Sequence, residues 1–237
     1  MKRFVLIGLL TALLMSHGAV SAQGDDERCL QKGGIWDAEK KECIVEAGYT
    51  INISYPLELT DNPFVESTID QFLKQTRDAF VAEYNQNGDP SPIHAWSLYV
   101  RYEVFHAKDR YLGIKFDVNT YTGGAHPLSA IQTMTLDLTE NKVLTSADLL
   151  TSPAALNQLA PLAETVLREQ LKDMLDETML TAGTQPTPEN FQSLLVTDTD
   201  LIIYFSPYQV APYAAGIQVV KLPLSQLKGI VADQFLS

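Results

Sequence analysis

Three consecutive stretches of alternating apolar and polar residues take up the middle of this chain, namely Ala95–Phe105, Gly113–Tyr121 and Leu128–Leu138. A period of two residues is typical of β-strands that bury one face. The connections are short, with a turn at Lys108–Arg110 and a loop with two glycines at residues 122–127. Strands joined in this way pair in antiparallel order. The chain is therefore expected to fold around a sheet of at least these three strands.

The residues before this sheet predict one more strand and a long helix. Gly48–Tyr55 alternates like a strand, and Pro56 ends it. Asp61 or Asn62 is then a candidate cap for a helix that Asn87–Gly88 would end. The apolar residues of this helix recur at helical spacing on one side: Val65, Ile69, Phe72, Leu73, Phe80 and Tyr84.

The residues after the sheet repeat the combination of helix and strands. Thr145–Asp148 is typical of a helix start, and a second amphipathic helix is expected further on, with Pro161 tolerated only in its first turn. Thr181–Pro188 is predicted to be a polar loop. The apolar positions of the second helix are Leu159, Leu162, Val166, Leu167, Leu171, Met174 and Leu175.

Three more strands and a short terminal helix complete the expected second half. Phe191–Val196 and Leu201–Phe205 flank a hairpin signal at Asp198–Asp200, Ile217–Leu222 follows as a strand, and a helix is expected within Leu224–Phe235. The fold class predicted from this order is α+β, with helices packed on one face of antiparallel sheet.

The predicted elements divide the chain into sequential parts. Residues 48–144 form an N-terminal α+β half and residues 145–237 a C-terminal α+β half, which together we expect to form one compact unit. A segment at residues 23–47 precedes them.

The first 22 residues have the three-part pattern of a secretory signal peptide. Lys2 and Arg3 form a basic end, Phe4–Met15 is apolar, and Val20–Ala22 offers a small-residue site with cleavage after Ala22. The apolar stretch is shorter than the roughly 18 residues of a membrane span, although an uncleaved anchor remains an alternative. We therefore expect a periplasmic or secreted protein without stable membrane insertion.

Cys29 and Cys43 are the two cysteines of the chain, and both follow the predicted signal. In an oxidising compartment, such an isolated pair predicts a disulfide that closes the segment at residues 23–47. The bridge could contribute about 3 kcal/mol to the free energy of unfolding in the chain-entropy model. A metal site is the alternative, but no histidine lies near the pair and zinc needs two more ligands.

The charge of the chain is strongly acidic. Its 17 basic and 29 acidic side chains give a net charge of −12, and loss of the signal would leave 15 basic side chains and a net charge of −14. Nucleic acid and anionic lipid surfaces would be repelled, whereas cationic proteins would be attracted at low salt. Solubility of a secreted protein is an equally good explanation of the acidity.

Two loops rich in glycine, proline and tyrosine are the candidate binding elements. Residues 121–127 read Tyr-Thr-Gly-Gly-Ala-His-Pro, and residues 206–216 read Ser-Pro-Tyr-Gln-Val-Ala-Pro-Tyr-Ala-Ala-Gly. Aromatic side chains on loops braced by proline are good interface anchors. The candidate binding residues are Tyr121, Gly123, Gly124, His126, Pro127, Tyr208, Pro212, Tyr213 and Gly216.

Each of these residues also has a purely structural interpretation. His126 could contact a partner, or its ring could bond a nearby carbonyl and brace the turn, with Gly123 and Gly124 supplying backbone angles that other residues avoid. Tyr208 and Tyr213 could both anchor a partner, or one of the two rings could face the core.

The sequence contains no catalytic motif that we can assign. A Gly-x-Ser-x-Gly elbow, a His-Glu-x-x-His helix and a phosphate-binding glycine loop are all missing. Glu103 and His106 are a candidate acid–base pair, but residues three apart on a strand point to opposite faces. We therefore expect Glu103 to be a surface carboxylate and His106 a half-buried imidazole. We therefore assign no catalytic residue, no metal and no cofactor.

Several segments follow, in the same order, one pattern of a known family: Ile51–Pro56, the first helix, Tyr111–Phe116, Tyr121–Pro127, Leu136–Leu138, Leu201–Phe205, Pro207–Gly216 and Val220–Pro223. From residue 48 onward the chain resembles the extracytoplasmic domain of RsiV-type anti-sigma factors and the non-catalytic part of PdaC-type peptidoglycan deacetylases. The resemblance implies an α+β domain that binds lysozyme or accompanies enzymes acting on cell-wall glycan.

The chain departs from both kinds of family member. An anti-sigma factor needs a cytoplasmic segment and a membrane span before this domain, and a deacetylase needs a separate metal-bearing catalytic domain. We therefore expect a freestanding recognition domain that is not an enzyme.

Three function classes remain. The first is a protein that binds lysozyme or another basic cell-wall hydrolase, as inhibitor, decoy or sensor. The second is a module associated with peptidoglycan or another cell-wall glycan, and the third is a hydrolase with paired carboxylates.

Overall fold

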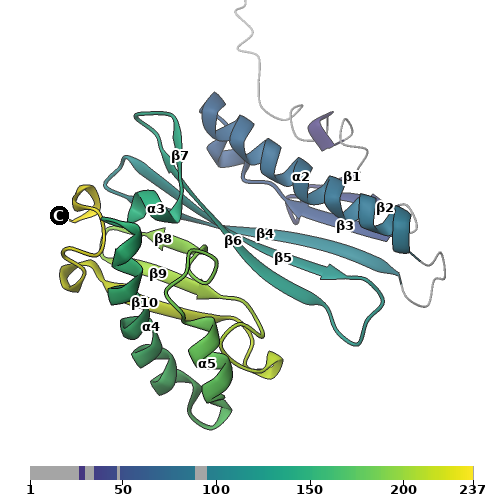
Figure 1. The fold of residues 1–237 in the computed structure, drawn as a ribbon. Coiled ribbons are helices and arrows are strands. Elements are labelled where there is room, and N and C mark those ends of the chain that lie inside the picture. The colour runs from purple at the N-terminus through teal and green to yellow at the C-terminus, as the bar shows by residue number, and fades with distance from the viewer. Residues whose placement is uncertain (1–26, 30–34, 47–48, 89–94, 237) are drawn as a thin grey trace, which may run out of the picture.

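The computed structural model describes residues 27–29, 35–46, 49–88 and 95–236, and in these residues two sheets and their helices form four layers (Figure 1). The large sheet has the strand order β1-β2-β3-β4-β5-β6-β7, and the small sheet has the order β10-β9-β8. The first half of the chain supplies β1 (Ile35–Asp37), β2 (Glu42–Glu46), β3 (Tyr49–Ser54), η1 (Leu57–Leu59), α2 (Pro63–Asn87), β4 (Trp96–Ala107), β5 (Tyr111–Tyr121), β6 (Leu128–Asp137) and β7 (Lys142–Leu144).

The second half of the chain supplies the small sheet and its helices. Its elements are α3 (Ser146–Leu149), η3 (Pro153–Ala155), α4 (Leu156–Leu171), η4 (Lys172–Met174), α5 (Glu177–Gly183), β8 (Leu194–Val196), β9 (Asp200–Phe205), η5 (Tyr213–Ala215), β10 (Gln218–Pro223), η6 (Leu224–Gln226) and η7 (Asp233–Phe235). The predicted α+β class in one compact unit is confirmed, and each sheet has its own helix (Figure 1).

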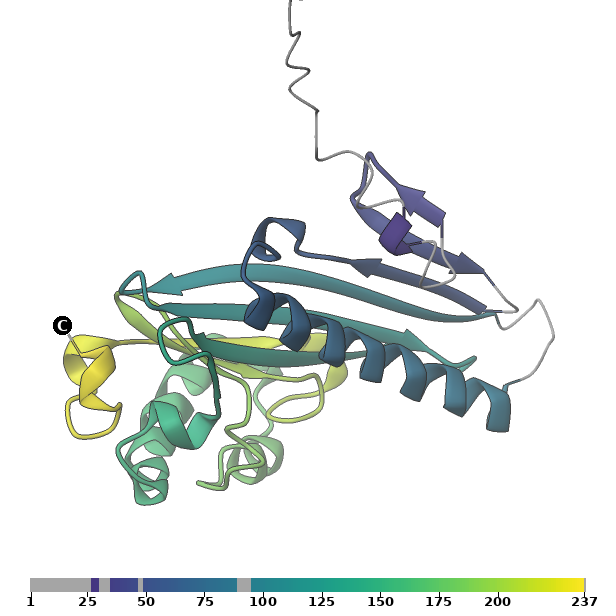
Figure 2. The same cartoon turned by 90° about the horizontal axis from the view of Figure 1, so that it is seen from above.

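Helix α2 covers one face of the large sheet (Figure 2). The Asn62 side chain caps its start by accepting from the backbone N–H groups of Phe64 and Val65, and Gly88 follows its end as predicted. Because α2 crosses over between β3 and β4, these two strands pair in parallel, whereas β4, β5 and β6 pair in antiparallel order. The buried residues under the helix come from alternate positions of the strands: Ile51, Leu98, Val100, Leu112, Ile114, Phe116 and Leu136.

The small sheet lies on the opposite face of the large sheet. Leu195, Ile202 and Tyr204 pack there against Ile131 and Phe105. The backbone N–H of Lys108 also donates to Asp198 Oδ1 at 2.7 Å, which ties the β8–β9 turn to the β4–β5 turn. The other face of the small sheet carries α4 and holds the larger core, which includes Leu159, Leu167, Ile203, Phe205 and Val220.

A capping box begins the second half where the sequence predicts a helix start. The Asp148 carboxylate accepts from the Thr145 backbone N–H at 2.9 Å and from the Thr145 hydroxyl at 2.7 Å. The Lys142 ammonium, followed by these Thr145 donors, lowers the pKa of Asp148 to about 2. The carboxylate is therefore ionised when it caps α3.

Three predictions for the second half were wrong in detail. Pro161 lies in the second turn of α4, because the helix begins at Leu156 and its buried face offsets the lost hydrogen bond. Helix α4 ends at Leu171, since Lys172 has a φ of 46° and turns the chain toward α5. Helix α5 continues to Gly183, so the loop predicted from Thr181 starts later.

The end of the chain forms two separate 3-10 turns, η6 and η7, where one short helix was predicted. Gly229 lies between them with a φ of 82°, a backbone conformation that no α-helix contains. Both turns still bury an apolar residue, Leu224 and Phe235 respectively.

The predicted disulfide is present. Cys29 and Cys43 are joined with an S–S distance of 2.08 Å and a Cα–Cα distance of 5.5 Å. Strand β2, which contains Cys43, pairs with β3 from Glu42 to Glu46, so the disulfide segment is continuous with the large sheet. The predicted signal peptide lies outside the described residues, and no helix within them is long and apolar enough to span a bilayer.

Candidate functional site

The two candidate loops meet at an aromatic cluster, which we define as His126, Tyr208 and Tyr213. The His126 ring stacks on the Tyr213 ring, with centroids 3.8 Å apart and an interplanar angle of 20°. The Tyr208 hydroxyl lies 3.2 Å from His126 Nε2, and the Tyr213 hydroxyl donates to the backbone carbonyl of Pro127 at 2.9 Å. The structure therefore brings together residues that are more than 80 positions apart in the chain.

The hydrogen bonds of His126 define the neutral tautomer of its ring. Nδ1 lies 3.1 Å from the Pro127 carbonyl oxygen, which can only accept, so Nδ1 carries a proton. In the neutral ring Nε2 is then an acceptor, and the Tyr208 hydroxyl donates to it. Both functions of His126, bracing its own turn and holding the second loop, are thus present in one side chain.

Backbone angles that favour glycine shape both loops. Gly123 in the β5–β6 loop has a φ of 88°, and Gly216 after η5 has a φ of 68°. Tyr208 itself has a φ of 69°, which is uncommon for a residue with a side chain and marks a conformation that its surroundings impose.

The Gln209 side chain also holds this second loop in place. Its Oε1 accepts from the Ser206 backbone N–H at 3.2 Å, and its Nε2 donates to the carbonyls of Gly183 and Asn190 at 3.3 and 3.0 Å. Sequence reasoning missed Gln209 because a glutamine on a loop has no recognisable spacing.

The candidate residues have different exposures. Tyr208 is 52% exposed, Pro212 is exposed, and Tyr213 is partly exposed. Neither tyrosine enters the core, so the alternative in which one ring faces inward was wrong. Val210 and Ala211 are buried instead and anchor the loop.

The β5–β6 loop holds the remaining candidates. Tyr121 ends β5 and is partly exposed, and Gly124 and Pro127 are exposed. Gly124 does not have a positive φ, and no atom lies within 4 Å of where its Cβ would be. Only the first glycine of the pair therefore needs to be glycine.

Replacing Gly123 by alanine is expected to lower the free energy of unfolding by about 1–2 kcal/mol, because alanine is strained at positive φ. The matched Gly124→Ala variant is expected to remain within about 0.5 kcal/mol of the parent protein. Urea unfolding of both variants measures the difference, and equal midpoints for the two would contradict the assignment.

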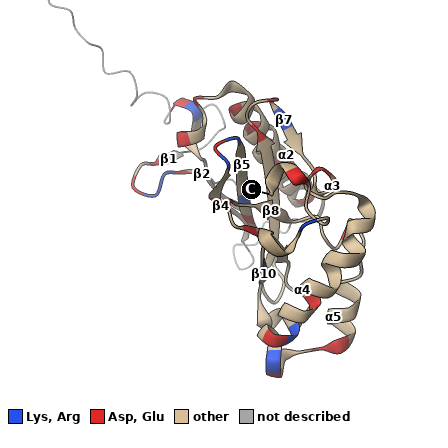
Figure 3. Cartoon of the chain, turned by 90° about the vertical axis from the view of Figure 1, so that its left-hand side faces the viewer, with Lys and Arg blue, Asp and Glu red and all other residues tan. Residues whose placement is uncertain are grey.

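The aromatic cluster lies in a part of the chain without formal charge. No aspartate, glutamate, lysine or arginine occurs in residues 118–136 or in residues 201–220. Figure 3 shows charged residues on the helices, on the turn between β1 and β2, and near β5 and β7. The two segments that carry the cluster therefore offer aromatic, apolar and hydrogen-bonding groups to a ligand.

A charged network lies on the large sheet beside the small one. The Lys115 ammonium contacts Glu103 at 2.6 Å, Asp117 at 3.2 Å and the Tyr204 ring at 5.5 Å from its centroid. Burial lowers the pKa of Lys115, but the hydrogen bonds to Glu103 and Asp117 outweigh this effect and leave the pKa above its usual value. Burial, followed by the charges of Glu103 and Asp117, raises the pKa of Tyr204. Both side chains thus hold their protons near neutral pH.

Glu103 and His106 point to opposite faces of β4, as predicted, because they pair with Lys115 and Leu112 respectively. His106 is exposed, so the predicted half-buried imidazole was wrong. Within the part of the chain that the structure describes, no group of three or more histidine, cysteine or acidic side chains could hold a metal ion.

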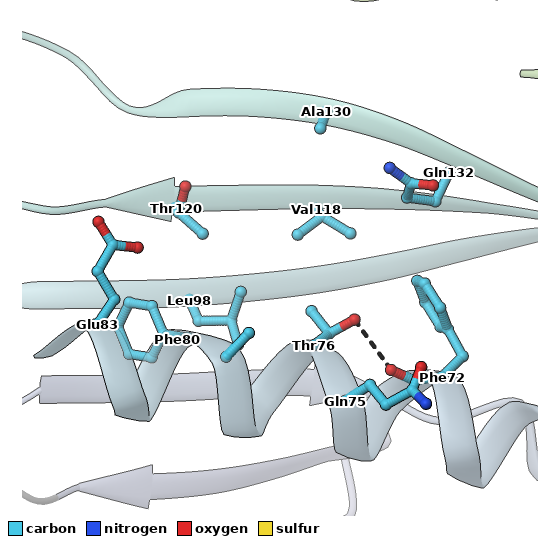
Figure 4. A pocket seen from close by; sticks show the side chains of 11 residues that line it. Phe72, Gln75, Thr76, Phe80, Glu83, Leu98, Val118, Thr120, Ala130 and Gln132 are labelled. Atoms are coloured by element: carbon cyan, nitrogen blue, oxygen red, sulfur yellow. Dashed lines mark hydrogen bonds between the residues drawn. The ribbon is translucent and has the colours of Figure 1, made fainter. Parts of the chain in front are cut away.

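An open groove of about 420 Å³ lies between α2 and strands β4–β6 (Figure 4). Phe72, Phe80 and Leu98 give it an apolar floor, and the Thr76 hydroxyl is already used to donate to the Phe72 carbonyl at 3.0 Å. Glu83 is the one charged residue among the described residues that line it. This groove offers no pair of groups for proton transfer, and we assign no ligand to it.

Comparison with known families divides the chain into two matched segments. Residues 39–129 match the family model for the deacetylase PdaC, and residues 147–225 match DUF3298, a family model of unknown function. The protein therefore combines a PdaC-like segment and a DUF3298-like segment in one compact unit. These matches support the PdaC part of the expected resemblance, and the resemblance to RsiV-type anti-sigma factors stays a prediction.

Two relatives of known sequence cover most of the chain. The peptidoglycan-N-acetylmuramic acid deacetylase PdaC of Bacillus subtilis is 28% identical over 202 residues, which are 81% of this chain and 42% of that protein. This chain thus spans less than half the length of that relative. The immunogenic protein MPT64 of Mycobacterium tuberculosis is 24% identical over 188 residues, which are 79% of this chain and 80% of that protein.

Two solved structures share the fold. A DUF3298 family protein from Pseudomonas aeruginosa has a TM-score of 0.57 and 21% identity, covering 84% of this chain and 89% of that one. A DUF3298 family member from Bacteroides fragilis has a TM-score of 0.51 and 20% identity, covering 78% and 84%. At this identity, the likeness concerns the fold alone.

Proposed function

We propose that this protein is a non-catalytic binding protein of the cell envelope that recognises the glycan of peptidoglycan through the aromatic cluster. The observation that carries the proposal is the cluster itself, in which the His126 and Tyr213 rings stack, the Tyr208 hydroxyl bonds His126, and both chain segments lack formally charged residues. The disulfide between Cys29 and Cys43 and the predicted signal peptide support a location outside the cytoplasm.

The chemistry of the cluster suits a neutral sugar chain. The C–H groups on the face of a pyranose ring pack against an aromatic ring, and its hydroxyl groups need hydrogen-bonding partners. Tyr208 offers an exposed ring, and the ring of Tyr213 is held in place by His126 and Pro127. Such pre-organised rings lose little conformational entropy when a ligand binds.

The relatives support the same choice of ligand. A protein named peptidoglycan-N-acetylmuramic acid deacetylase is similar to 81% of this chain. We infer from this similarity that the shared segment serves in this chain to recognise peptidoglycan.

A basic protein such as lysozyme is the second candidate ligand, and the net charge favours it. A mature chain with a charge of −14 attracts a cationic partner over a distance and speeds association. The resemblance to RsiV-type lysozyme receptors implies the same partner. Because the cluster has no charge of its own, this attraction would come from the surrounding surface and would be weakened by salt.

Removal of the Tyr213 ring is expected to lower the affinity of the mature protein for insoluble peptidoglycan about tenfold. Tyr213→Ala takes away the ring and also the stacking partner of His126. Tyr213→Phe keeps the ring and loses only the bond to the Pro127 carbonyl, so it should retain most of the binding. Co-sedimentation at low and high salt measures both variants, with Val143→Ala as an exposed control outside both loops.

Two outcomes would count against the glycan. Absence of sedimentation at both salt concentrations would remove it as the ligand. Salt-sensitive binding of lysozyme, detected by calorimetry and lost in Tyr213→Ala, would establish the second candidate in its place.

A further inference from the structure

A row of polar and aromatic side chains continues from the aromatic cluster along β4 and β5. The strand register places Tyr99 opposite Asn119 and Ser97 opposite Tyr121. These four residues occupy alternate positions of their strands, so their side chains share one face of the sheet. All four are at least partly accessible, and Tyr99 is 39% exposed.

The small sheet lies on this same face but covers its other end. Phe105 on β4 packs against the small sheet, and a Cβ added to Gly113 on β5 would lie 3.2 Å from Leu195. Phe105 pairs with Gly113. The two lie an even number of residues from Tyr99 on β4 and from Asn119 on β5, so they belong to the same face of the sheet. The uncovered part of the face therefore begins beyond the network of Lys115 and ends at the β5–β6 loop.

The row is continuous with the aromatic cluster. Thr120 pairs with Leu128, so Tyr121 comes next to Pro127 where the strands end. Pro127 is the residue whose carbonyl accepts from Tyr213. Tyr99 and Tyr121 are diagonal neighbours on adjacent strands, and such positions lie about 7–8 Å apart along the sheet. One sugar ring therefore has room to contact both side chains.

The hydrogen-bonding groups of the row suit hydroxyl and acetamido groups. The Asn119 side chain accepts from the Ser129 hydroxyl at 2.5 Å through Oδ1, so its amide nitrogen remains the donor end. Beyond Tyr99, the Arg101 guanidinium lies 5.9 Å from the Tyr99 ring centroid and holds Glu42 at 2.8 Å. The row thus carries donors and acceptors without a net charge of its own.

We propose that Tyr99, Asn119 and Tyr121 form additional sugar-binding positions beside the aromatic cluster, so that the protein binds an extended glycan strand along β4 and β5. This inference rests on the proposed function and adds to it the length and direction of the ligand. An open row on a sheet face accommodates the middle of a polymer, whereas a closed pocket would accept only its end.

The test is the dependence of affinity on the length of the sugar chain. Calorimetry with β-1,4-linked N-acetylglucosamine disaccharide, tetrasaccharide and hexasaccharide should show affinity rising with length in the parent protein. Tyr99→Ala should lower the hexasaccharide affinity about fivefold, the effect of one lost ring contact, and leave the disaccharide affinity unchanged. Tyr99→Phe keeps the ring and should behave like the parent protein.

The possible results separate this inference from the proposed function. Equal affinity for all three lengths, or a Tyr99→Ala variant that equals the parent on the hexasaccharide, would overturn the extended site and leave the aromatic cluster as the whole site. Lack of binding to every sugar and to peptidoglycan would overturn both. Thermal unfolding of Tyr99→Ala checks that a loss of affinity does not come from a loss of fold.

Discussion

Replacing Gly183 by alanine is expected to lower the free energy of unfolding by about 2–3 kcal/mol and to disturb the aromatic cluster. An added Cβ would lie 2.0 Å from the Gln209 carbonyl oxygen and 2.7 Å from its carbonyl carbon. Both atoms belong to the backbone, so the loop that follows Tyr208 must move to make room. Gln209 Nε2 also donates to the Gly183 carbonyl, so this bond would be lost as well.

The measurement needs both the stability of the fold and the environment of the tyrosine rings. Chemical unfolding gives the stability of Gly183→Ala, and Gly124→Ala is the matched control because no atom lies within 4 Å of its Cβ position. Near-ultraviolet circular dichroism should show altered tyrosine signals in Gly183→Ala alone. An unchanged melting temperature in this variant would mean that α5 and the Tyr208 loop do not approach each other this closely.

Replacing Arg101 by methionine is expected to destabilise the protein by about 3 kcal/mol, because it leaves the Glu42 carboxylate buried without its cation. The Glu42 side chain is 6% exposed, and Arg101 Nη2 lies 2.8 Å from its Oε1. Its second oxygen, Oε2, is buried and has no hydrogen-bond partner among the described residues. Arg101 Nη1 also donates to Asn52 Oδ1 at 3.3 Å, so the substitution removes a hydrogen bond to β3 as well.

A double-mutant comparison separates the buried charge from the lost packing. Arg101→Met combined with Glu42→Leu is expected to recover most of the stability, since an apolar pair can replace a buried ion pair. Glu103→Gln, which removes the exposed partner of Lys115, should cost less than about 1 kcal/mol. If Arg101→Met lowers the free energy of unfolding no more than Glu103→Gln does, the Glu42 carboxylate is better solvated than the structure indicates.

Local patterns in the sequence determined much of the first half. Alternating residues predicted β4, β5 and β6 within a few positions, and Asn62 and Gly88 marked the ends of α2. These features depend on neighbours in the chain, through strand alternation, helix capping and short turns, so they can be predicted without tertiary contacts. The disulfide was also predictable, because only two cysteines follow the predicted signal.

Elements that depend on distant partners were predicted less well. Helix α4 keeps Pro161 in its second turn because its apolar face packs on the small sheet. Helix α5 ends at Gly183, whose missing Cβ leaves room for the backbone of Gln209. The parallel pairing of β3 with β4 follows from the crossover of α2, which alternation within each strand cannot show.

By itself, the sequence predicted that residues 121–127 and 206–216 form loops rich in glycine, proline and tyrosine. Only the tertiary structure decided that the two loops contact each other, because the packing of the small sheet on the large one brings the β9–β10 connection to the β5–β6 loop. It also decided that Val210 faces the core, that both tyrosines face outward, and that Tyr99 lies on the face shared with Tyr121. Contacts between residues this far apart in the chain come from the packing of layers, which no local spacing records.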